Sequence, residues 1–153
     1  MSILIGASVG LVLFSYKAII SPLLETISST KDIVTKLIKV NHSNISQNLK
    51  ELAIISRIET INSFIREIEC EEKPTSFIKT FEGLIKDIND TLFTIRIALQ
   101  DIETKVSYHN TIYFQNWRNL DCDKEFNIVV KYNEILKEQF DMLIKILAIP
   151  CSR

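Results

Sequence analysis

The sequence predicts an all-α protein: an up-down four-helix bundle with a long third helix and an apolar N-terminal helix. Three observations support this fold class. Apolar residues recur at spacings of three and four along most of the chain, which places them on one face of a helix. Only 3 Gly and 3 Pro occur in 153 residues, too few for the closely spaced turns of an all-β protein. The segments between the apolar stripes are short, which favours antiparallel neighbouring helices.

A chain of this length can bury one sizeable core. We therefore expect residues 1–150 to form a single helical-bundle domain, of which residues 1–20 are an apolar N-terminal segment. The chain is 46% hydrophobic and 24% charged, which excludes a disordered or low-complexity protein. Its 18 basic and 19 acidic residues give a net charge of −1, so no positive field indicates nucleic-acid binding.

The N-terminal segment differs from the rest of the chain because it carries almost no charge. Residues 1–24 contain a single charged residue, Lys17. A membrane-spanning helix needs about 20 predominantly apolar residues, and the uncharged run 1–16 reaches spanning length only if Lys17 extends its amine to the interface. Three interpretations follow: a helix buried in the core of the bundle, a segment that inserts into membranes, or a permanent transmembrane anchor.

If this segment enters a membrane, its apolar side chains are the membrane-binding residues: Ile3, Leu4, Ile5, Leu11, Val12, Leu13 and Phe14. Lysines around the first polar loop would then contact anionic lipid headgroups, at about 1 kcal/mol per charge near such a surface. These lysines are Lys31, Lys36, Lys39 and Lys50. The alternative is an ordinary solvated face, because Asp32 and Glu51 are mixed among them.

Helical segments follow in order along the chain. The stripe over residues 22–40 starts at Pro22 and is interrupted by polar residues at 28–30. The polar run 41–44 suits a turn, since its side chains compete for backbone hydrogen bonds. A stripe over residues 52–68 follows. We expect it to end before residues 71–74, because Pro74 can open a helix but not sit inside one.

The clearest stripe predicts the long third helix. All of its steps are three or four residues, and it continues through His109 to Trp117; its members are Ile78, Phe81, Ile85, Ile88, Leu92, Ile95, Leu99, Ile102 and Val106. Asn119, Asp121 and Asp123 are candidate N-caps for the last helix. That helix carries a stripe of its own, and Pro150 ends it: Phe126, Val129, Leu136, Phe140, Leu143 and Leu147.

No pattern in the sequence is typical of an enzyme. There is no glycine-rich phosphate loop, no serine-hydrolase motif and no Glu-x-x-His pair of a di-iron bundle. The three cysteines, Cys70, Cys122 and Cys151, lack the spacing of zinc ligands, and their odd number is typical of reduced thiols in the cytosol. We therefore expect no catalysis, no cofactor and no metal, in a cytoplasmic protein with peripheral or inserted membrane association.

The order of these elements resembles a known family. The run from Lys124-Glu125-Phe126 through Asn133–Leu136 to residues 143–149, together with the aromatic corner Tyr113-Phe114-x-x-Trp117, is similar to the N-terminal four-helix bundle of mixed-lineage-kinase-domain-like (MLKL) proteins. The similarity is nearest to the fungal versions and extends to HeLo-type cell-death domains. It covers residues 22–149, as a pattern of amphipathic helices with few fixed letters.

The resemblance implies a non-enzymatic signalling or cell-death module that oligomerises with itself, or binds a helical partner protein, and perturbs membranes. Residues 3–16 would be the membrane-entering segment, with anionic lipids as partners of the four lysines. The alternative function, from the apolar segment alone, is a structural coiled-coil scaffold anchored by an N-terminal transmembrane helix.

Overall fold

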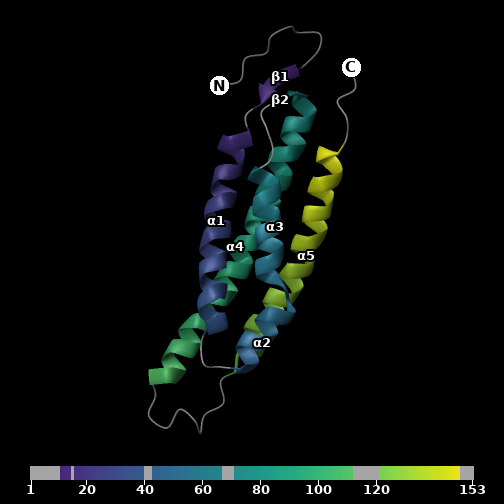
Figure 1. Ribbon diagram of the computed structural model, residues 1–153. Helices are drawn as coiled ribbons and strands as arrows, with labels where there is room; N and C mark the ends of the chain where they lie inside the picture. The colour runs from purple at the N-terminus through teal and green to yellow at the C-terminus, as the bar shows by residue number, and fades with distance from the viewer. Residues whose placement is uncertain (1–10, 15, 40–42, 67–70, 112–120, 149–153) are drawn as a thin grey trace.

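Five α-helices and one pair of short strands form the part of the chain that the computed structural model describes, residues 11–14, 16–39, 43–66, 71–111 and 121–148 (Figure 1). Helices dominate, so the all-α fold class is confirmed at this level. In chain order the elements are β1 (Leu11–Phe14), α1 (Tyr16–Lys39), α2 (Ser43–Glu51), α3 (Ile54–Arg66), β2 (Glu71–Pro74), α4 (Thr75–Thr111) and α5 (Asp123–Leu147).

The long helices lie side by side along one elongated body. α4 packs against both α1 and α5, and α1 also packs against α2 and α3. Figure 1 shows β1 and β2 at one end of this body, here called the strand end, and α2 with the end of α1 towards the opposite end, here called the far end. α1 leads away from the strand end, α3 returns to it, α4 leads away again and α5 returns.

The core of the bundle is built from the predicted stripes. Phe81 and the seven stripe residues that follow it on α4, from Ile85 to Val106, are buried, and Ile78 packs against them from a partly buried position. α1, α3 and α5 contribute the opposing side chains, among them Leu23, Leu37, Ile58, Leu136 and Leu143. Continuous burial over α4 explains why a 37-residue helix is stable here, because its apolar face is covered along its length.

The first predicted helix differs from α1 at its start. α1 begins at Tyr16, so Pro22 lies inside the helix and does not open it. A proline inside a helix removes the hydrogen bond that the carbonyl four residues earlier would accept, which here is the carbonyl of Ala18. The polar stretch that follows remains helical, and within it the hydroxyls of Thr26 and Thr30 donate to the carbonyls of Pro22 and Thr26.

The last two residues of the predicted turn at 41–44 belong to a helix that the sequence pattern did not predict. α2 begins at Ser43, and the Ser46 hydroxyl donates to the carbonyl of Ile38, 3.0 Å away, in the last turn of α1. α2 and α3 are separated by Leu52 and Ala53, and the φ of Ala53, 52°, is in the left-handed region. Because a left-handed residue does not continue a right-handed helix, α2 ends before it and α3 begins after it.

The expectation of an apolar N-terminal helix is wrong for residues 11–14, which form strand β1. β1 pairs antiparallel with β2, with Leu11 opposite Pro74 and Phe14 opposite Glu71. A short run of four apolar residues has the length of a strand as well as of a helical turn, and an extended partner decides between them. Residues 71–74, expected only as a helix end, provide that partner.

Candidate functional site

The candidate membrane-binding residues divide between described and undescribed parts of the chain. Leu11, Val12, Leu13 and Phe14 form β1 at the strand end. Ile3, Leu4 and Ile5 lie outside the described residues. β1 pairs with β2 beyond the first turn of α1 and does not run along the helices. The interpretation of the apolar segment as a helix is therefore wrong for residues 11–14, which form a strand.

The four candidate headgroup lysines do not share one surface with β1. Lys31 is paired with Glu59 of α3, at an Nζ–Oε1 distance of 3.2 Å. Lys36 lines a shallow pocket with the acidic residues Glu25, Asp32 and Glu103. Lys39 ends α1 and Lys50 lies in the last turn of α2, both exposed.

The length of α1 separates these lysines from the apolar strand. At a rise of about 1.5 Å per residue, Lys39 lies about 34 Å along α1 from Tyr16, the residue at which α1 leaves the strand end. At physiological ionic strength, salt screens the interaction between exposed charges that are more than about 8–10 Å apart. The structure thus places β1 at the strand end and Lys39 and Lys50 towards the far end of the bundle.

Two other lysines, which the sequence pattern did not single out, lie at the strand end. Lys79 is in the second turn of α4, directly after β2, and Lys145 is in the last turn of α5. Both are exposed. The sequence signal for them is weak, because they are 66 residues apart and come together at one end only through the antiparallel course of α4 and α5.

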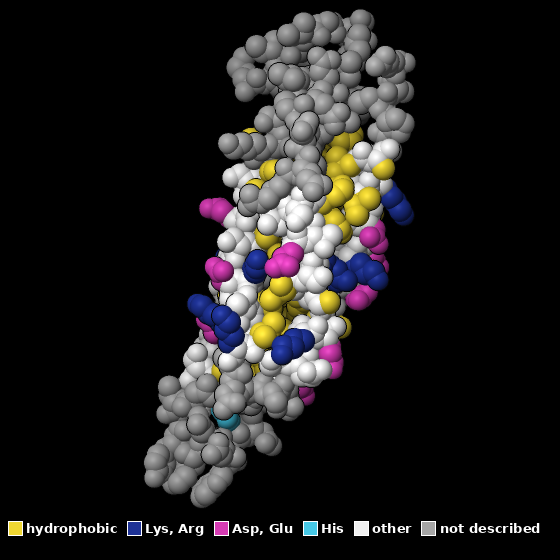
Figure 2. Space-filling view, viewed as in Figure 1, with side chains coloured by type: hydrophobic (Ala, Val, Ile, Leu, Met, Phe, Trp, Pro, Cys, Tyr) yellow, Lys and Arg dark blue, Asp and Glu magenta, His cyan; other side chains and the backbone are white. Residues whose placement is uncertain are grey.

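Exposed apolar side chains accompany these lysines on α5. Met142 and Ile144 are 54% and 38% exposed, and both lie in the last two turns of the helix. Figure 2 shows hydrophobic side chains gathered on the visible face towards the strand end of the bundle. Apolar surface beside basic residues is typical of a site that contacts a membrane or a protein partner.

Within the described residues, no helix is both long enough and apolar enough to cross a membrane. The same part of the chain contains no group of three or more His, Cys, Asp or Glu side chains placed to hold a metal ion. The aromatic corner at 113–117, on which part of the family resemblance rests, lies outside the described residues.

Comparisons with protein-family models, with curated proteins and with solved structures give no match for this chain. The resemblance to MLKL and HeLo-type bundles therefore stays a prediction.

Proposed function

We propose that this protein is a non-enzymatic helical interaction module that contacts membranes with the strand end of its bundle. The observation that carries the proposal is the position of β1. β1 is a run of four consecutive apolar residues, and its backbone lies at the strand end of the bundle, against α4. An apolar side chain gains free energy when it enters lipid, at about 25 cal/mol per Å² of surface removed from water.

The surroundings of β1 support the same proposal. Lys79 and Lys145 are exposed at this end, and Met142 and Ile144 expose apolar surface near it. Basic residues at the rim of an apolar surface are attracted to anionic headgroups. We propose anionic lipid as the partner because of these two lysines, which act against the acidic Glu71 and Glu72 of β2, opposite Phe14 and Leu13.

We also infer a finer description of the fold, in which α2 and α3 together are the second helix of an up-down four-helix bundle. The break at Ala53 divides that helix, and the course of the chain from α1 to α5 then alternates in direction. A cell-death role and self-association depend on the family resemblance alone and stay predictions.

Flotation on vesicles tests the proposed function. We expect the full chain to float with vesicles that contain phosphatidylserine and to float poorly with pure phosphatidylcholine. A variant that lacks residues 1–14 should remain at the bottom of the gradient with both. Circular dichroism provides the folding control, since the variant should keep its helical signal. Equal flotation of the two proteins would contradict the proposal.

Carbonate extraction of membranes from expressing cells separates this function from the anchored scaffold. A protein that contacts the surface through the strand end should appear in the supernatant after alkaline washing. Complete retention in the pellet would support the transmembrane anchor and reject our proposal.

A further inference from the structure

The short helix α2 is attached to the bundle more sparsely than the long helices are. Within residues 45–51, the part of α2 whose burial the structure describes, only Ile45 and Leu49 are buried. Among the described elements, α2 packs mainly against α1. α1 ends at Lys39 and α2 begins at Ser43, so neither helix continues into the other. A helix of nine residues is unstable by itself in water, and its order depends on these few contacts.

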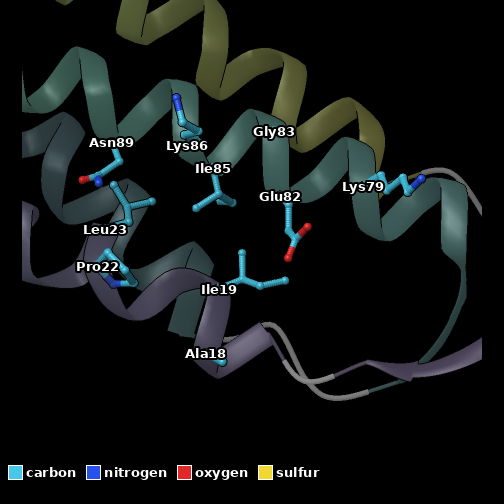
Figure 3. Close-up of a pocket in the computed structure, with 10 residues that line it drawn as sticks. All are labelled: Ala18, Ile19, Pro22, Leu23, Lys79, Glu82, Gly83, Ile85, Lys86 and Asn89. Carbon is cyan, nitrogen blue, oxygen red and sulfur yellow. The ribbon is translucent and has the colours of Figure 1, made fainter. Parts of the chain in front are cut away.

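The long helices are held together differently. α4 packs along both α1 and α5, and its buried face runs from Phe81 to Val106. Figure 3 shows one part of this packing near the strand end, at a groove of about 620 Å³ between α1 and α4, where Ile19 and Ile85 extend towards each other. Ile85 is 3% exposed. Buried side chains of this kind recur along α4, so we expect the long helices to unfold together.

The backbone hydrogen bonds of α2 end at Ala53. The N–H of Leu52 donates to the carbonyl of Asn48, and the N–H of Ala53 donates to the carbonyl of Lys50. The carbonyl of Ala53 in turn accepts from the N–H of Arg57, in the first turn of α3. Ala53 is left-handed, a conformation that is unfavourable for a residue with a Cβ. A movement of α2 about Ala53 can therefore relax that residue and leave α3 intact.

Two polar contacts hold α2 in place, one near each of its ends. The Ser46 hydroxyl donates to the carbonyl of Ile38 on α1, and the Asn133 amide donates to the carbonyl of Leu52, directly after α2. Asn133 Oδ1 accepts from Arg57 of α3. The side chain of Asn133 thus bonds to the chain on both sides of Ala53, and only its bond to Leu52 has to break when α2 moves away.

We propose that residues 43–52, here called the flap, open about Ala53 while α3 and the long helices stay folded, and that Asn133 is the latch that holds the flap closed. In the closed state Ile45 and Leu49 are hidden in the core. Opening exposes both side chains at the far end of the bundle, so this end has a large apolar surface only in the open state. A partner that binds this surface competes with the latch.

The flap lies towards the far end and β1 lies at the strand end. The inference therefore does not depend on the proposed membrane contact, and its test uses the full chain in solution without vesicles.

Native-state hydrogen exchange, measured for each amide by NMR at a series of low urea concentrations, tests whether the flap opens separately. We expect the flap amides of residues 48–52 to exchange at least a hundredfold faster than the amides of residues 85–106 in α4. Their exchange should also depend weakly on urea, because opening exposes little surface. The amides of residues 60–65 in α3 should follow the steep urea dependence of α4. A common urea dependence for the flap and α4 would overturn the proposal, as would an α3 that exchanges with the flap.

One matched pair of substitutions distinguishes opening of the flap from unfolding of the whole bundle. Ile45 in the flap and Ile88 in α4 are both buried. Ile88→Val should speed exchange in α4 about three- to tenfold and leave the flap unchanged, since the contacts of Ile88 persist when the flap opens. Ile45→Val should speed both by the same factor, because its contacts are lost in either event. If Ile88→Val speeds the flap as much as α4, α2 leaves only when the bundle unfolds, and the proposal fails.

Variants of the latch and of the hinge test their roles. Asn133→Ala should speed exchange of the flap about tenfold or more, because the carbonyl of Leu52 loses its partner. Asn127→Ala, at an exposed position of the same helix, should leave the exchange of the flap unchanged. Ala53→Gly should slow the flap about threefold, since glycine adopts the left-handed conformation without steric cost, and Ala53→Val should speed it. Circular dichroism confirms that each variant is folded. An unchanged flap in folded Asn133→Ala would overturn the proposal, as would equal or reversed effects of the two Ala53 variants.

Discussion

Glu125 shows how one buried carboxylate connects two helices. It lies in the first turn of α5, and its Oε1 is 2.6 Å from the Nζ of Lys105 on α4. Lys105 also donates to the carbonyl of Asp121, 3.2 Å away. The hydrogen bond from Lys105 lowers the pKa of Glu125 against the opposing effect of desolvation, and the same bond raises the pKa of Lys105.

This pair predicts a pH dependence of stability at low pH. The pKa of Glu125 is lower in the folded chain, so the unfolded chain binds its proton first as the pH falls. The stabilisation is present above the unfolded value of about 4.3 and is lost as the pH falls through the folded value. We expect Glu125→Gln to lower the melting temperature at pH 6, and the difference from the native chain to shrink towards pH 3.

The exposed Glu138 on the same helix is the matched control. The difference in melting temperature between Glu138→Gln and the native chain should not shrink from pH 6 to pH 3. A constant difference between the native chain and Glu125→Gln from pH 6 to pH 3 would show that the carboxylate contributes shape and not charge.

The junction of α2 and α3 shows, at the scale of an element, how α5 stabilises a break in a helix. Asn133 of α5 is 3% exposed. Its amide donates to the carbonyl of Leu52, 3.1 Å away, and its Oδ1 accepts from Arg57 Nη1 at 2.7 Å. The left-handed Ala53 lies between these two partners in the chain. A single buried side chain therefore contacts both sides of the break.

We expect Asn133→Ala to destabilise the protein by about 2–3 kcal/mol, because it leaves the partly buried Leu52 carbonyl and one N–H of Arg57 without their partner. Urea unfolding measures the change. Asn127→Ala, at an exposed position on the same helix, should change the free energy of unfolding by less than about 0.5 kcal/mol. Similar losses for the two variants would contradict the role given to Asn133.

The elements differ in how far the sequence predicts them. α4 and α5 follow from periodicity alone, because every step of their stripes is short-range and their burial is continuous. β1 does not, since its four residues become a strand only through pairing with residues 71–74, far away in the chain. The start of α2 was missed for a related reason. Its polar first turn has no apolar period, and the Ser46 bond to Ile38 depends on the position of α1.

The whole molecule has two distinct ends, and this polarity changes the interpretation of the candidate site. Sequence reasoning identified the apolar residues of β1 and the lysines around the first loop, but it placed them together. The two ends of α1 are about 34 Å apart along its axis. Which lysines lie beside β1 depends on the directions of all the helices together, and the residue spacing within any one segment does not show it.

The last prediction tests this polarity through charge. Reversing Lys79 and Lys145, at the strand end, should weaken binding to phosphatidylserine vesicles at least tenfold, since each lysine near such a surface contributes about 1 kcal/mol. Reversing Lys36 and Lys39 makes the same change in net charge at positions beyond the screening length from β1, and should alter binding by less than about twofold. Co-sedimentation at physiological salt measures both double variants. A larger loss from the far-end pair would show that the bundle meets the membrane with the end at which α1 finishes, and that β1 is turned away from the lipid.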